Sequence, residues 1–511
     1  MKLFSALLAF FTGSALGQTF TNPILWEDLA DLDVLRVNNT FYYTSSTMHY
    51  SPGAPILQSY DLVNWEYISH AVPTLNWGSK YSLTGGQAYV KGIYASTLRY
   101  RPSNKLWYWI GCVEYSTTYV FTAPSVTGPW TQAASIATCY YDAGLLIDDD
   151  DTMYVAYGNT QISVAQLSSN GLSQVKTQQV FSSKIGSIEG SRFYKRNGKY
   201  YIFNTLPANA EYVLQASSPF GPYTQKLLES NVGSPVSGAG IPHQGGIVDT
   251  PSGQWYYMAF IDNYPGGRTP VLAPITWGSD GFPVLTTSNG AWPKTGNYPL
   301  PLHTLTSPLG IDTFSGTTLS AQWEWNHNPD TSKFTVNNGL TLNTATVTSD
   351  LYKARNTLTH RIYGPKSRAT IALTISSMAS GDRAGLAMLR DSSAYIAVVR
   401  SGSTFRISQV SGLTMDASWN TASTGSEVAG VNLPAGATQV WLRATADISP
   451  TGKTASFQYS TDGNTFSNIG NSVSLNTAWQ FFMGYRYGIF NYATSALGGS
   501  VRVSSFDMET A

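Results

Sequence analysis

Residues 30–44 read ADLDVLRVNNTFYYT, in which the acid Asp31 precedes two short strand-like runs separated by the turn Asn38-Asn39. The same order returns as YDAGLLIDDDDTMYVAY at residues 141–157 and as IEGSRFYKRNGKYYIF at residues 188–203, headed by Asp142 and Glu189. In each copy a strand containing tyrosine follows the acid by 11 or 12 residues. These copies indicate a repeated module of strand, turn and strand.

Two further copies of the module carry other residues at the head. Tyr94 precedes an aromatic run at residues 106–108, and His243 precedes another at residues 255–257. Successive strand centres are separated by 65, 47, 46 and 55 residues, at Tyr42, Trp107, Tyr154, Tyr200 and Trp255. A period near 50 with several strands per unit is typical of a radial repeat such as a β-propeller. If all five heads point at the axis, three carboxyl groups, a histidine and a tyrosine converge in one pocket.

The second half of the chain has a different pattern. Residues 299–311 are rich in Pro and Leu without periodicity, which indicates a linker after a propeller spanning residues 18–298. Beyond it, apolar residues alternate at period two in runs at 369–375, 384–389, 394–399, 405–410, 440–446, 455–459 and 501–508. This pattern predicts a two-sheet, jelly-roll-like β-sandwich over residues 312–511. With no helical periodicity over a useful length, we expect an all-β protein.

The composition narrows the classes of partner. At 511 residues the chain is too long for one ordinary core. Lys plus Arg balance Asp plus Glu at 30 each, so no basic field favours nucleic acid or an anionic membrane. The chain contains 32 Tyr and 14 Trp, whose amphipathic rings suit a wet surface that stacks on sugars, although tyrosines also fill strands.

The N-terminus predicts export. Lys2 precedes an apolar run at residues 3–12 and the small-x-small sequence Ala15-Leu16-Gly17, a pattern typical of a cleaved signal peptide at residues 1–17. We therefore expect a secreted, extracellular and monomeric protein. Its two cysteines, Cys112 and Cys139, are either a disulfide or a buried reduced pair. Asn38 heads a sequon, Asn38-Asn39-Thr40, that predicts N-glycosylation on a turn.

Three acids in one pocket suit one chemistry in particular. Hydrolysis of a glycosidic bond with inversion uses one carboxylate to activate water and one carboxylic acid to protonate the leaving oxygen, with roughly 6.5–9.5 Å between them. A third carboxylate keeps the pKa of the acid high, because neighbouring like charges resist simultaneous ionisation. Each of the three acids lies among apolar and small residues. A single such acid is more often a structural ion-pair partner, but three at matched repeat positions favour catalysis.

The order of these motifs resembles glycoside hydrolase family 43. The resemblance rests on seven motifs and covers essentially the whole mature chain: Asn22-Pro23, Ala30-Asp31-Leu32-Asp33-Val34, the segment at residues 59–65, Gly92-Ile93-Tyr94-Ala95, Asp142, Glu189-Gly190 and the segment at residues 245–250. The opening of the second half, at residues 312–326, looks like the sandwich domain of the family's xylosidase-like branch.

The resemblance implies a five-bladed propeller and site roles that can be assigned residue by residue. The resemblance implies that Asp31 is the general base, that Glu189 is the general acid, and that Asp142 raises the pKa of the acid. Tyr94 and Arg268 are expected to bind the terminal sugar. His243 is expected near the propeller axis, binding substrate or lying beside a structural calcium ion, and no cofactor is required.

The resemblance also sets the expected substrates. Residues 26–29 and 48–55 look closest to secreted fungal arabinofuranosidases that debranch arabinoxylan, including doubly substituted xylose, and the alternative is an exo-acting β-D-xylosidase. Asp31-Leu32 and Tyr94 depart from the family's usual Asp-Pro and Trp, which affects the sugar pocket more than the acids. A non-catalytic carbohydrate-binding protein is the alternative of another class. If the sandwich walls the cleft, its candidate residues are Trp325, His327, Phe490 and Tyr492.

Overall fold

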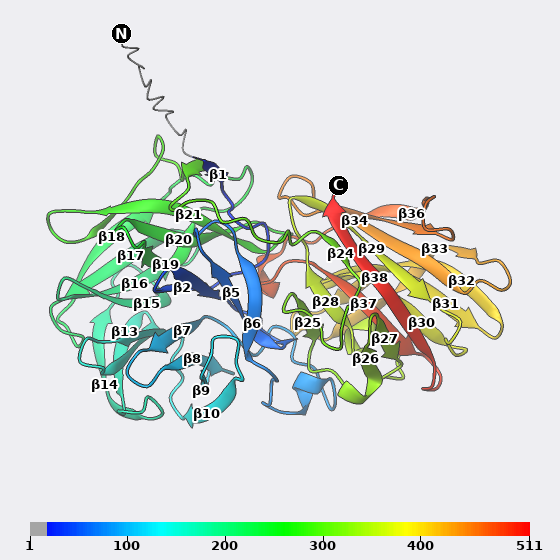
Figure 1. Ribbon diagram of the computed structural model, residues 1–511, viewed down its shortest axis with the longest axis horizontal. Coiled ribbons are helices and arrows are strands. Elements are labelled where there is room, and N and C mark those ends of the chain that lie inside the picture. Colours follow the sequence, from blue (N-terminus) through cyan, green and yellow to red (C-terminus); the bar gives the residue numbers. More distant parts are fainter. Residues whose placement is uncertain (1–17) are drawn as a thin grey trace, which may run out of the picture.

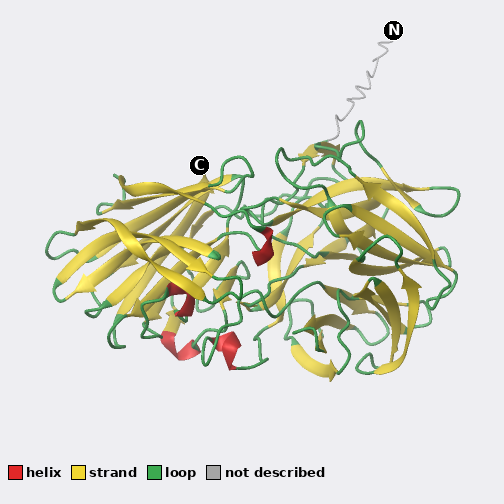
Figure 2. Ribbon diagram, turned by 180° about the vertical axis from the view of Figure 1, so that it is seen from behind, coloured by secondary structure: helices red, strands yellow, loops and turns green. Residues whose placement is uncertain are grey.

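A computed structural model describes residues 18–511, so the predicted signal peptide lies outside the described residues. The chain forms two β-rich halves that lie side by side, the earlier residues in one and the later residues in the other (Figure 1). Figure 2 shows that strands dominate both halves. The described chain also contains four short 3₁₀ helices: η1 (Ser79–Ser82), η2 (Thr331–Lys333), η3 (Leu351–Lys353) and η4 (Trp479–Phe481). No helix within residues 18–511 has the length and apolar character needed to cross a bilayer.

The first half is a five-bladed β-propeller, which confirms the predicted fold class. Each blade is a four-stranded antiparallel sheet, and the strands follow one another in chain order. Blade 1 contains β2 (Asp33–Val37), β3 (Thr40–Thr44), β5 (Gly53–Ser59) and β6 (Glu66–Val72); blade 2 contains β7 (Ser96–Arg101), β8 (Leu106–Val113), β9 (Thr117–Ala123) and β10 (Thr131–Ile136). Blade 3 contains β11 (Gly144–Ile147), β12 (Met153–Asn159), β13 (Gln161–Leu167) and β14 (Gln174–Ser182); blade 4 contains β15 (Glu189–Arg196), β16 (Lys199–Leu206), β17 (Ala210–Ala216) and β18 (Thr224–Ser230). Blade 5 contains β19 (His243–Asp249), β20 (Trp255–Asp262), β21 (Arg268–Trp277) and β22 (Pro283–Leu285).

The innermost strands close the ring. Each first strand contacts the first strand of the next blade, and β19 of blade 5 contacts β2 of blade 1. Outside the blades, β1 (Thr19–Thr21) pairs with β23 (Thr295–Asn297), so the start of the described chain is fastened to the end of the propeller. The heads of the repeats therefore meet at the centre, because each head lies at or just before an innermost strand.

The repeated aromatic residues of the second strands pack between blades. Tyr42 of blade 1 meets Trp107 of blade 2 edge to face, with ring centroids 4.8 Å apart. Tyr154 of blade 3 meets Phe220 of blade 4 in the same way at 5.8 Å. Such offset aromatic pairs bury large apolar areas and add favourable quadrupole contacts. The regular spacing of these residues along the chain thus reflects the repeated interface between blades.

The second half is a sandwich of two eight-stranded sheets. One sheet runs in the order β26 (Phe334–Val336), β27 (Leu340–Asn343), β38 (Ser500–Thr510), β29 (Lys366–Thr374), β34 (Gln439–Asp447), β35 (Thr454–Ser460) and β36 (Ser467–Ser474), with β24 (Gly310–Asp312) also paired to β38. The other runs β33 (Thr421–Asn432), β32 (Thr404–Met415), β31 (Ser392–Ser401), β30 (Asp382–Leu389), β37 (Arg486–Ala493), β28 (Leu358–Arg361), β25 (Trp323–Asn326) and β4 (Tyr50–Ser51). The inward-facing residues of the alternating strands form one large apolar core between the sheets.

The two halves share a sheet edge and a core. Strand β4 belongs by sequence to the propeller, yet Ser51 pairs with Trp325 of the sandwich strand β25. An apolar cluster next to it joins Tyr50 and Tyr89 of the propeller to Phe490 of the sandwich. A large apolar contact of this kind holds two domains in one arrangement.

A buried ion cluster reinforces this interface. Glu324 of β25 is fully buried and lies 2.5 Å from Arg486, 2.9 Å from Arg361 and 3.1 Å from His70 of the propeller. Burial opposes the ionisation of Glu324, but the two guanidinium groups outweigh it and hold the pKa of this carboxyl well below its usual range. Removal of either partner would leave a buried charge unpaired.

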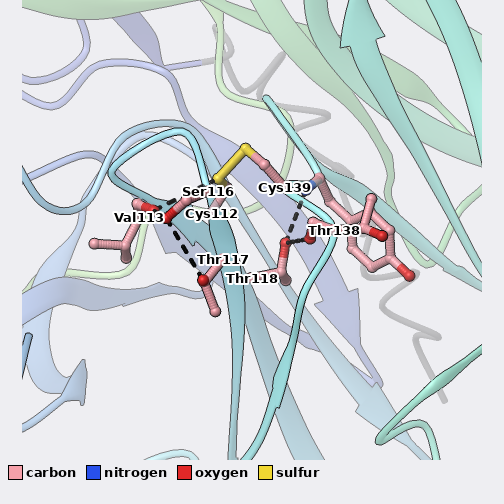
Figure 3. Close-up of a disulfide and its surroundings, with 8 residues drawn as sticks. Cys112, Val113, Ser116, Thr117, Thr118, Thr138 and Cys139 are labelled. Atoms are coloured by element: carbon pink, nitrogen blue, oxygen red, sulfur yellow. Dashed lines mark hydrogen bonds between the residues drawn. A yellow bond between two sulfur atoms is a disulfide. The ribbon is translucent and has the colours of Figure 1, made fainter.

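A disulfide joins Cys112 of β8 to Cys139, 27 residues further on (Figure 3). Beside it, the Thr118 hydroxyl donates to the Thr138 carbonyl and accepts from the Tyr140 N–H, both at 2.8 Å. Closing a loop of this length stabilises the folded state by about 3.5 kcal/mol in the chain-entropy model. The bridge thus fastens to blade 2 the segment that leads into Asp142.

Asn38, the first residue of the predicted glycosylation sequon, is exposed on the turn between β2 and β3.

Two buried histidines at the interface predict sensitivity of the fold to acid. His49 of the propeller and His327 of the sandwich have ring centroids 4.7 Å apart. Burial lowers the pKa of His327 to about 3, and burial followed by repulsion from His327 lowers the pKa of His49 well below its usual range. Between the ordinary pKa of about 6.5 and these lowered values, the unfolded chain binds protons that the folded chain does not. The free energy of unfolding therefore falls as pH falls through this window, by up to about 1.4 kcal/mol per pH unit for each histidine.

We expect His327→Gln to lower the melting temperature at pH 7, because the buried packing is changed. Between pH 7 and pH 4.5, the melting temperature of this variant should fall by less than that of the wild type, because one of the two buried histidines that cause the pH dependence has been removed. The control is His303→Gln, at an exposed position, which should keep the wild-type dependence. Equal pH dependence in the wild type and in His327→Gln would contradict the argument.

Candidate active site

One pocket of about 100 Å³ opens at the heads of the blades. It is lined by Asp31, Met48, Tyr94, Ala95, Tyr115, Tyr141, Asp142, Glu189, Gln244, Arg268 and Phe482. Five of the six residues expected at the site from the sequence are therefore in one place. The sixth, His243, does not line this pocket.

The backbone at the blade heads is bent into the left-handed region. The φ angle is 56° at Asp31, 52° at Asp142, 70° at Gly190 and 45° at Gln244. This conformation is unfavourable for residues other than glycine and persists only where the surrounding structure enforces it. Left-handed residues other than glycine cluster at functional sites, and here they sit at the heads of three different blades.

The Asp31 carboxylate is held from two sides. Its Oδ1 accepts from Arg268 Nη1 at 2.5 Å, and its Oδ2 accepts from Arg268 Nη2 at 2.8 Å and from the Ser46 hydroxyl at 2.6 Å. A carboxylate has about four acceptor positions, so three are filled and one remains on Oδ1. This arrangement fixes the direction of the free lone pair, as a base that activates water requires.

Glu189 is held through one oxygen only. Its Oε2 accepts from the Tyr141 hydroxyl at 2.9 Å and from Asn159 Nδ2 at 2.6 Å. No other group within residues 18–511 hydrogen-bonds to the side chain, so Oε1 is left for a ligand in the pocket. Burial raises the pKa of Glu189 above its usual value; the hydrogen bonds from Tyr141 and Asn159 oppose this shift, and repulsion from Asp31 adds to it.

Asp142 is the acid whose pKa is raised the most strongly of the three. Burial, followed by repulsion from Glu189 and from Asp31, raises the pKa of Asp142 well above its usual range. Arg192 and the Gly190 N–H, which donates to Asp142 Oδ2 at 3.0 Å, oppose this shift. Since repulsion between two carboxylates acts on both, Asp142 and Glu189 together retain a proton at a pH where an isolated carboxyl has lost its own.

Arg268 belongs to the pocket but is largely occupied by protein partners. Besides the two bonds to Asp31, its Nε donates to the Phe482 carbonyl at 3.0 Å. These contacts use three of its five N–H donors, so two remain for the sugar contact expected from the sequence. Its main interaction in this structure is the ion pair with Asp31.

The position of His243 departs from the expectation. Its Nδ1 lies 3.0 Å from the Ile241 carbonyl and its Nε2 lies 4.0 Å from an Asp262 carboxylate oxygen. A β-bulge between His243 and Gly246 and the left-handed φ of Gln244 turn the neighbouring Gln244, instead of His243, into the pocket.

The surroundings of His243 also fail to supply a calcium site. Calcium takes 6–8 oxygen ligands, whereas the groups near this imidazole offer one carboxylate and one carbonyl. Within residues 18–511, no group of three His, Cys, Asp or Glu side chains is arranged to hold a metal ion.

Three tyrosines form a row on one side of the pocket. The Tyr94 and Tyr115 rings are stacked with centroids 5.2 Å apart, and the Tyr115 and Tyr141 rings are stacked at 6.0 Å. Tyr94 is also fixed by its hydroxyl, which donates to the Val90 carbonyl at 2.6 Å. Tyr115 and Tyr141 were not predicted from the sequence; the signal available for Tyr141 was its position next to Asp142.

The sandwich contributes one wall of the pocket, through Phe482. This residue follows η4 and has a left-handed φ of 61°. The sandwich residues expected at the cleft were different ones, and that expectation is wrong: Trp325, His327, Phe490 and Tyr492 are all buried in apolar or interface packing. No local sequence pattern marks Phe482 as a pocket residue, because its position at the pocket depends on how the two halves dock.

The pocket can hydrolyse a bond between a sugar and an oxygen leaving group. A carboxylate with one free lone pair faces the same space as a carboxyl whose pKa is raised by burial, and a third acid, whose pKa is raised further, lies beside them. This division of environments is the one needed for a general base and a general acid to work at the same pH.

Comparison with known proteins places both halves in the same group. Residues 20–283 match the model of glycosyl hydrolases family 43, and residues 311–509 match that of the beta xylosidase C-terminal concanavalin A-like domain. A putative beta-xylosidase of Xylanibacter ruminicola is 30% identical over 70% of this chain and 68% of its own length. The non-reducing end alpha-L-arabinofuranosidase BoGH43B of Bacteroides ovatus is 29% identical over 61% of this chain and 62% of its own.

One solved structure is similar over nearly the whole chain. It is a family 43 glycoside hydrolase engineered to display both endo-xylanase and exo-arabinofuranosidase activity, with a TM-score of 0.94 and 49% identity. The similarity covers 97% of this chain and 100% of that one.

The shared proton of the acid pair leads to a prediction about pH. Asp142→Asn removes one negative charge, while the amide oxygen can still accept from the Gly190 N–H. Glu189 then loses its neighbour's repulsion and its pKa falls. We expect the alkaline limb of the pH profile of kcat to move to lower pH by roughly one unit, and kcat to fall about 10²-fold.

The matched control is Asp150→Asn, an exposed carboxylate in the hairpin turn of the same blade, which should leave the profile unchanged. An alkaline limb that stays in place in Asp142→Asn would show that Asp142 does not set the pKa of the acid.

Proposed function

The chain belongs to glycosyl hydrolase family 43, and from this membership we propose that it is an inverting α-L-arabinofuranosidase that removes arabinofuranosyl side chains from arabinoxylan. The observation that carries the proposal is the pocket at the blade heads, in which two buried acids and one half-buried acid, each with different partners, surround a space suited to one terminal sugar.

We propose the following division of work. Asp31 accepts a proton from water through its one free lone pair while Arg268 and Ser46 keep the carboxylate in place. Glu189 donates its proton to the leaving glycosidic oxygen through Oε1. Asp142 maintains the proton on Glu189 and fixes the adjacent backbone through the Gly190 N–H. The water then attacks the face of the sugar opposite the leaving group, which inverts the anomeric centre.

The preference for an arabinoside rests on the similarity of this chain to proteins described as having arabinofuranosidase activity. The solved structure with exo-arabinofuranosidase activity has the same fold over nearly the whole chain at 49% identity, and the Bacteroides ovatus relative is an arabinofuranosidase. The row Tyr94, Tyr115 and Tyr141 offers aromatic faces on which sugars of a branched polymer can stack. Doubly substituted xylose fits the same proposal.

A second candidate is an exo-acting β-D-xylosidase. A beta-xylosidase of Formosa agariphila is 27% identical over 69% of this chain, and the Xylanibacter ruminicola relative bears a similar description. The acids, the inversion and the shape of the pocket serve both reactions. The two candidates therefore differ in the sugar that the pocket accepts, not in the chemistry.

We further propose that the enzyme acts outside the cell as a monomer. The signal-like sequence of residues 1–17 supports export. The Cys112–Cys139 disulfide and the exposed sequon at Asn38 suit an oxidising, glycosylating route. Sequencing of the secreted protein should find Gln18 at its N-terminus, and an intact Met1 in a cellular fraction would contradict export.

The assignment of base and acid predicts the behaviour of two variants. Asp31→Ala and Glu189→Ala should each lower kcat by about 10³-fold or more, because the water or the leaving group is no longer assisted. Circular dichroism should show that both variants remain folded, since neither side chain contributes to the blade cores. Hydrolysis by both at near wild-type rates would instead favour a carbohydrate-binding protein with a contaminating activity.

The sugar preference predicts the products. We expect the secreted protein to release arabinose from wheat arabinoxylan and no xylose from linear xylo-oligosaccharides, as measured by chromatography of the products. NMR of the residual branches should then show which linkages are lost. Xylose released from the linear substrates would establish the xylosidase instead.

A further inference from the structure

Asp28 is a buried acid that lies outside the pocket, three residues before Asp31. Its side chain accepts two backbone N–H groups from distant parts of the chain: Oδ1 from Arg268 at 2.8 Å and Oδ2 from Gly484 at 3.0 Å. Arg268 begins the propeller strand β21, whereas Gly484 belongs to the sandwich. One carboxylate therefore bridges the two halves of the molecule.

Both bridged residues lead directly to groups in the pocket. The Arg268 side chain is paired with Asp31, and its Nε donates to the Phe482 carbonyl at 3.0 Å. The Tyr264 hydroxyl also donates to that carbonyl, at 3.2 Å. Phe482 lies two residues before Gly484 and forms the sandwich wall of the pocket. The contacts form a closed loop from Asp28 through Arg268 and Phe482 to Gly484.

The packing around this loop leaves little freedom. A Cβ atom placed on Gly267 would lie 2.3 Å from Asp28 Oδ1, and one placed on Gly484 would lie 2.3 Å from the Gly266 carbonyl oxygen. Asp28 itself is 8% exposed. A longer side chain at position 28 or a side chain at either glycine has no space, so the backbone segments approach as closely as glycine allows.

We propose that Asp28 is a positioning residue for the reaction, which fixes Arg268 against the base Asp31 and holds the Phe482 wall of the sandwich in place. The inference rests on the proposed function, because it assigns Asp31 the role of base. Asp28 does not touch the pocket. It acts through the backbone of the two segments that supply Arg268 and Phe482.

The alternative is that Asp28 only holds the two halves together. The interface has other buried groups for that purpose, including Glu324 of the sandwich, which lies 3.1 Å from His70 of the propeller, and the apolar cluster around Tyr50. A purely adhesive role predicts a loss of stability without a change in turnover below the melting temperature. A positioning role predicts a loss of kcat in the folded enzyme.

The test is Asp28→Asn in the full-length enzyme. The amide retains one acceptor oxygen and places a donor group against the other N–H, so either Arg268 or Gly484 is released. We expect kcat to fall at least about 30-fold because the base is misplaced, and KM to rise by less than about fivefold from the displaced wall. Rates are measured with aryl α-L-arabinofuranoside and aryl β-D-xyloside at a temperature where circular dichroism shows the variant to be folded.

Asp61→Asn is the matched control. Asp61 is also fully buried in the propeller and accepts N–H groups from Val63, Asn64 and His303, but it does not line the pocket. This variant should change kcat and KM by no more than twofold, whatever its effect on the melting temperature. Unchanged kcat in folded Asp28→Asn would overturn the inference, as would an equal loss in Asp61→Asn.

A second variant reaches the same contact from the sandwich. Gly484→Ala leaves Asp28 intact but forces the segment away from the Gly266 carbonyl, and it should lower kcat in the same way. If Asp28→Asn does not fold, near wild-type kcat in Gly484→Ala overturns the inference. A wild type inactive on both glycosides would overturn the proposed function and this inference with it, whereas an active wild type with unchanged variants counts against Asp28 alone.

Discussion

The arrangement of the acids depends on one buried guanidinium, that of Arg192. It is fully buried in β15 and donates to the carbonyls of Asp31, Leu32 at 2.7 Å, Ser191 at 2.9 Å and Ala143 at 3.1 Å. These carbonyls belong to the heads of blades 1, 3 and 4, each at or near one of the acids. A planar group with five donors in fixed directions can bind these four carbonyls at once, whereas a lysine has only three donors. The left-handed residues at these heads persist because this group, together with the closed ring of blades, over-determines them.

On this fixed frame, chemically similar carboxyls acquire different properties from their partners. Asp31 has a guanidinium beside it and a single free lone pair, whereas the pKa of buried Asp142 is raised by burial and by repulsion from half-buried Glu189. Arg192 opposes the rise in the pKa of Asp142 without cancelling it. Carboxyl groups in different electrostatic environments therefore coexist within one pocket because of geometry and burial, as the proposed division into base and acid requires.

The sequence predicted the parts of this arrangement that repeat. The acid heads, the hairpin turns and the aromatic strands recur in the same order with a period near 50 residues, so Asp31, Asp142, Glu189 and Tyr94 could be assigned to one pocket before any coordinates. The sequence repeat was less informative where a local irregularity of the backbone decides which side chain points into the pocket. The bulge after His243 replaces it by Gln244, and a one-residue shift of this kind leaves no mark on hydrophobic periodicity. Phe482 was out of reach, because it is set by docking between segments more than two hundred residues apart.

The same docking explains why the sandwich is part of the active site and not an appended module. Strand β4 leaves blade 1 to pair with β25, and the returning chain completes the blade through β5. The segment between β3 and β5 therefore belongs to both halves, and the apolar surface around Tyr50 and Tyr89 is covered only by the sandwich. A propeller without its partner would expose this surface and lose one wall of the pocket. The second domain thus contributes to the site by covering this apolar surface and by holding the loop that carries Phe482.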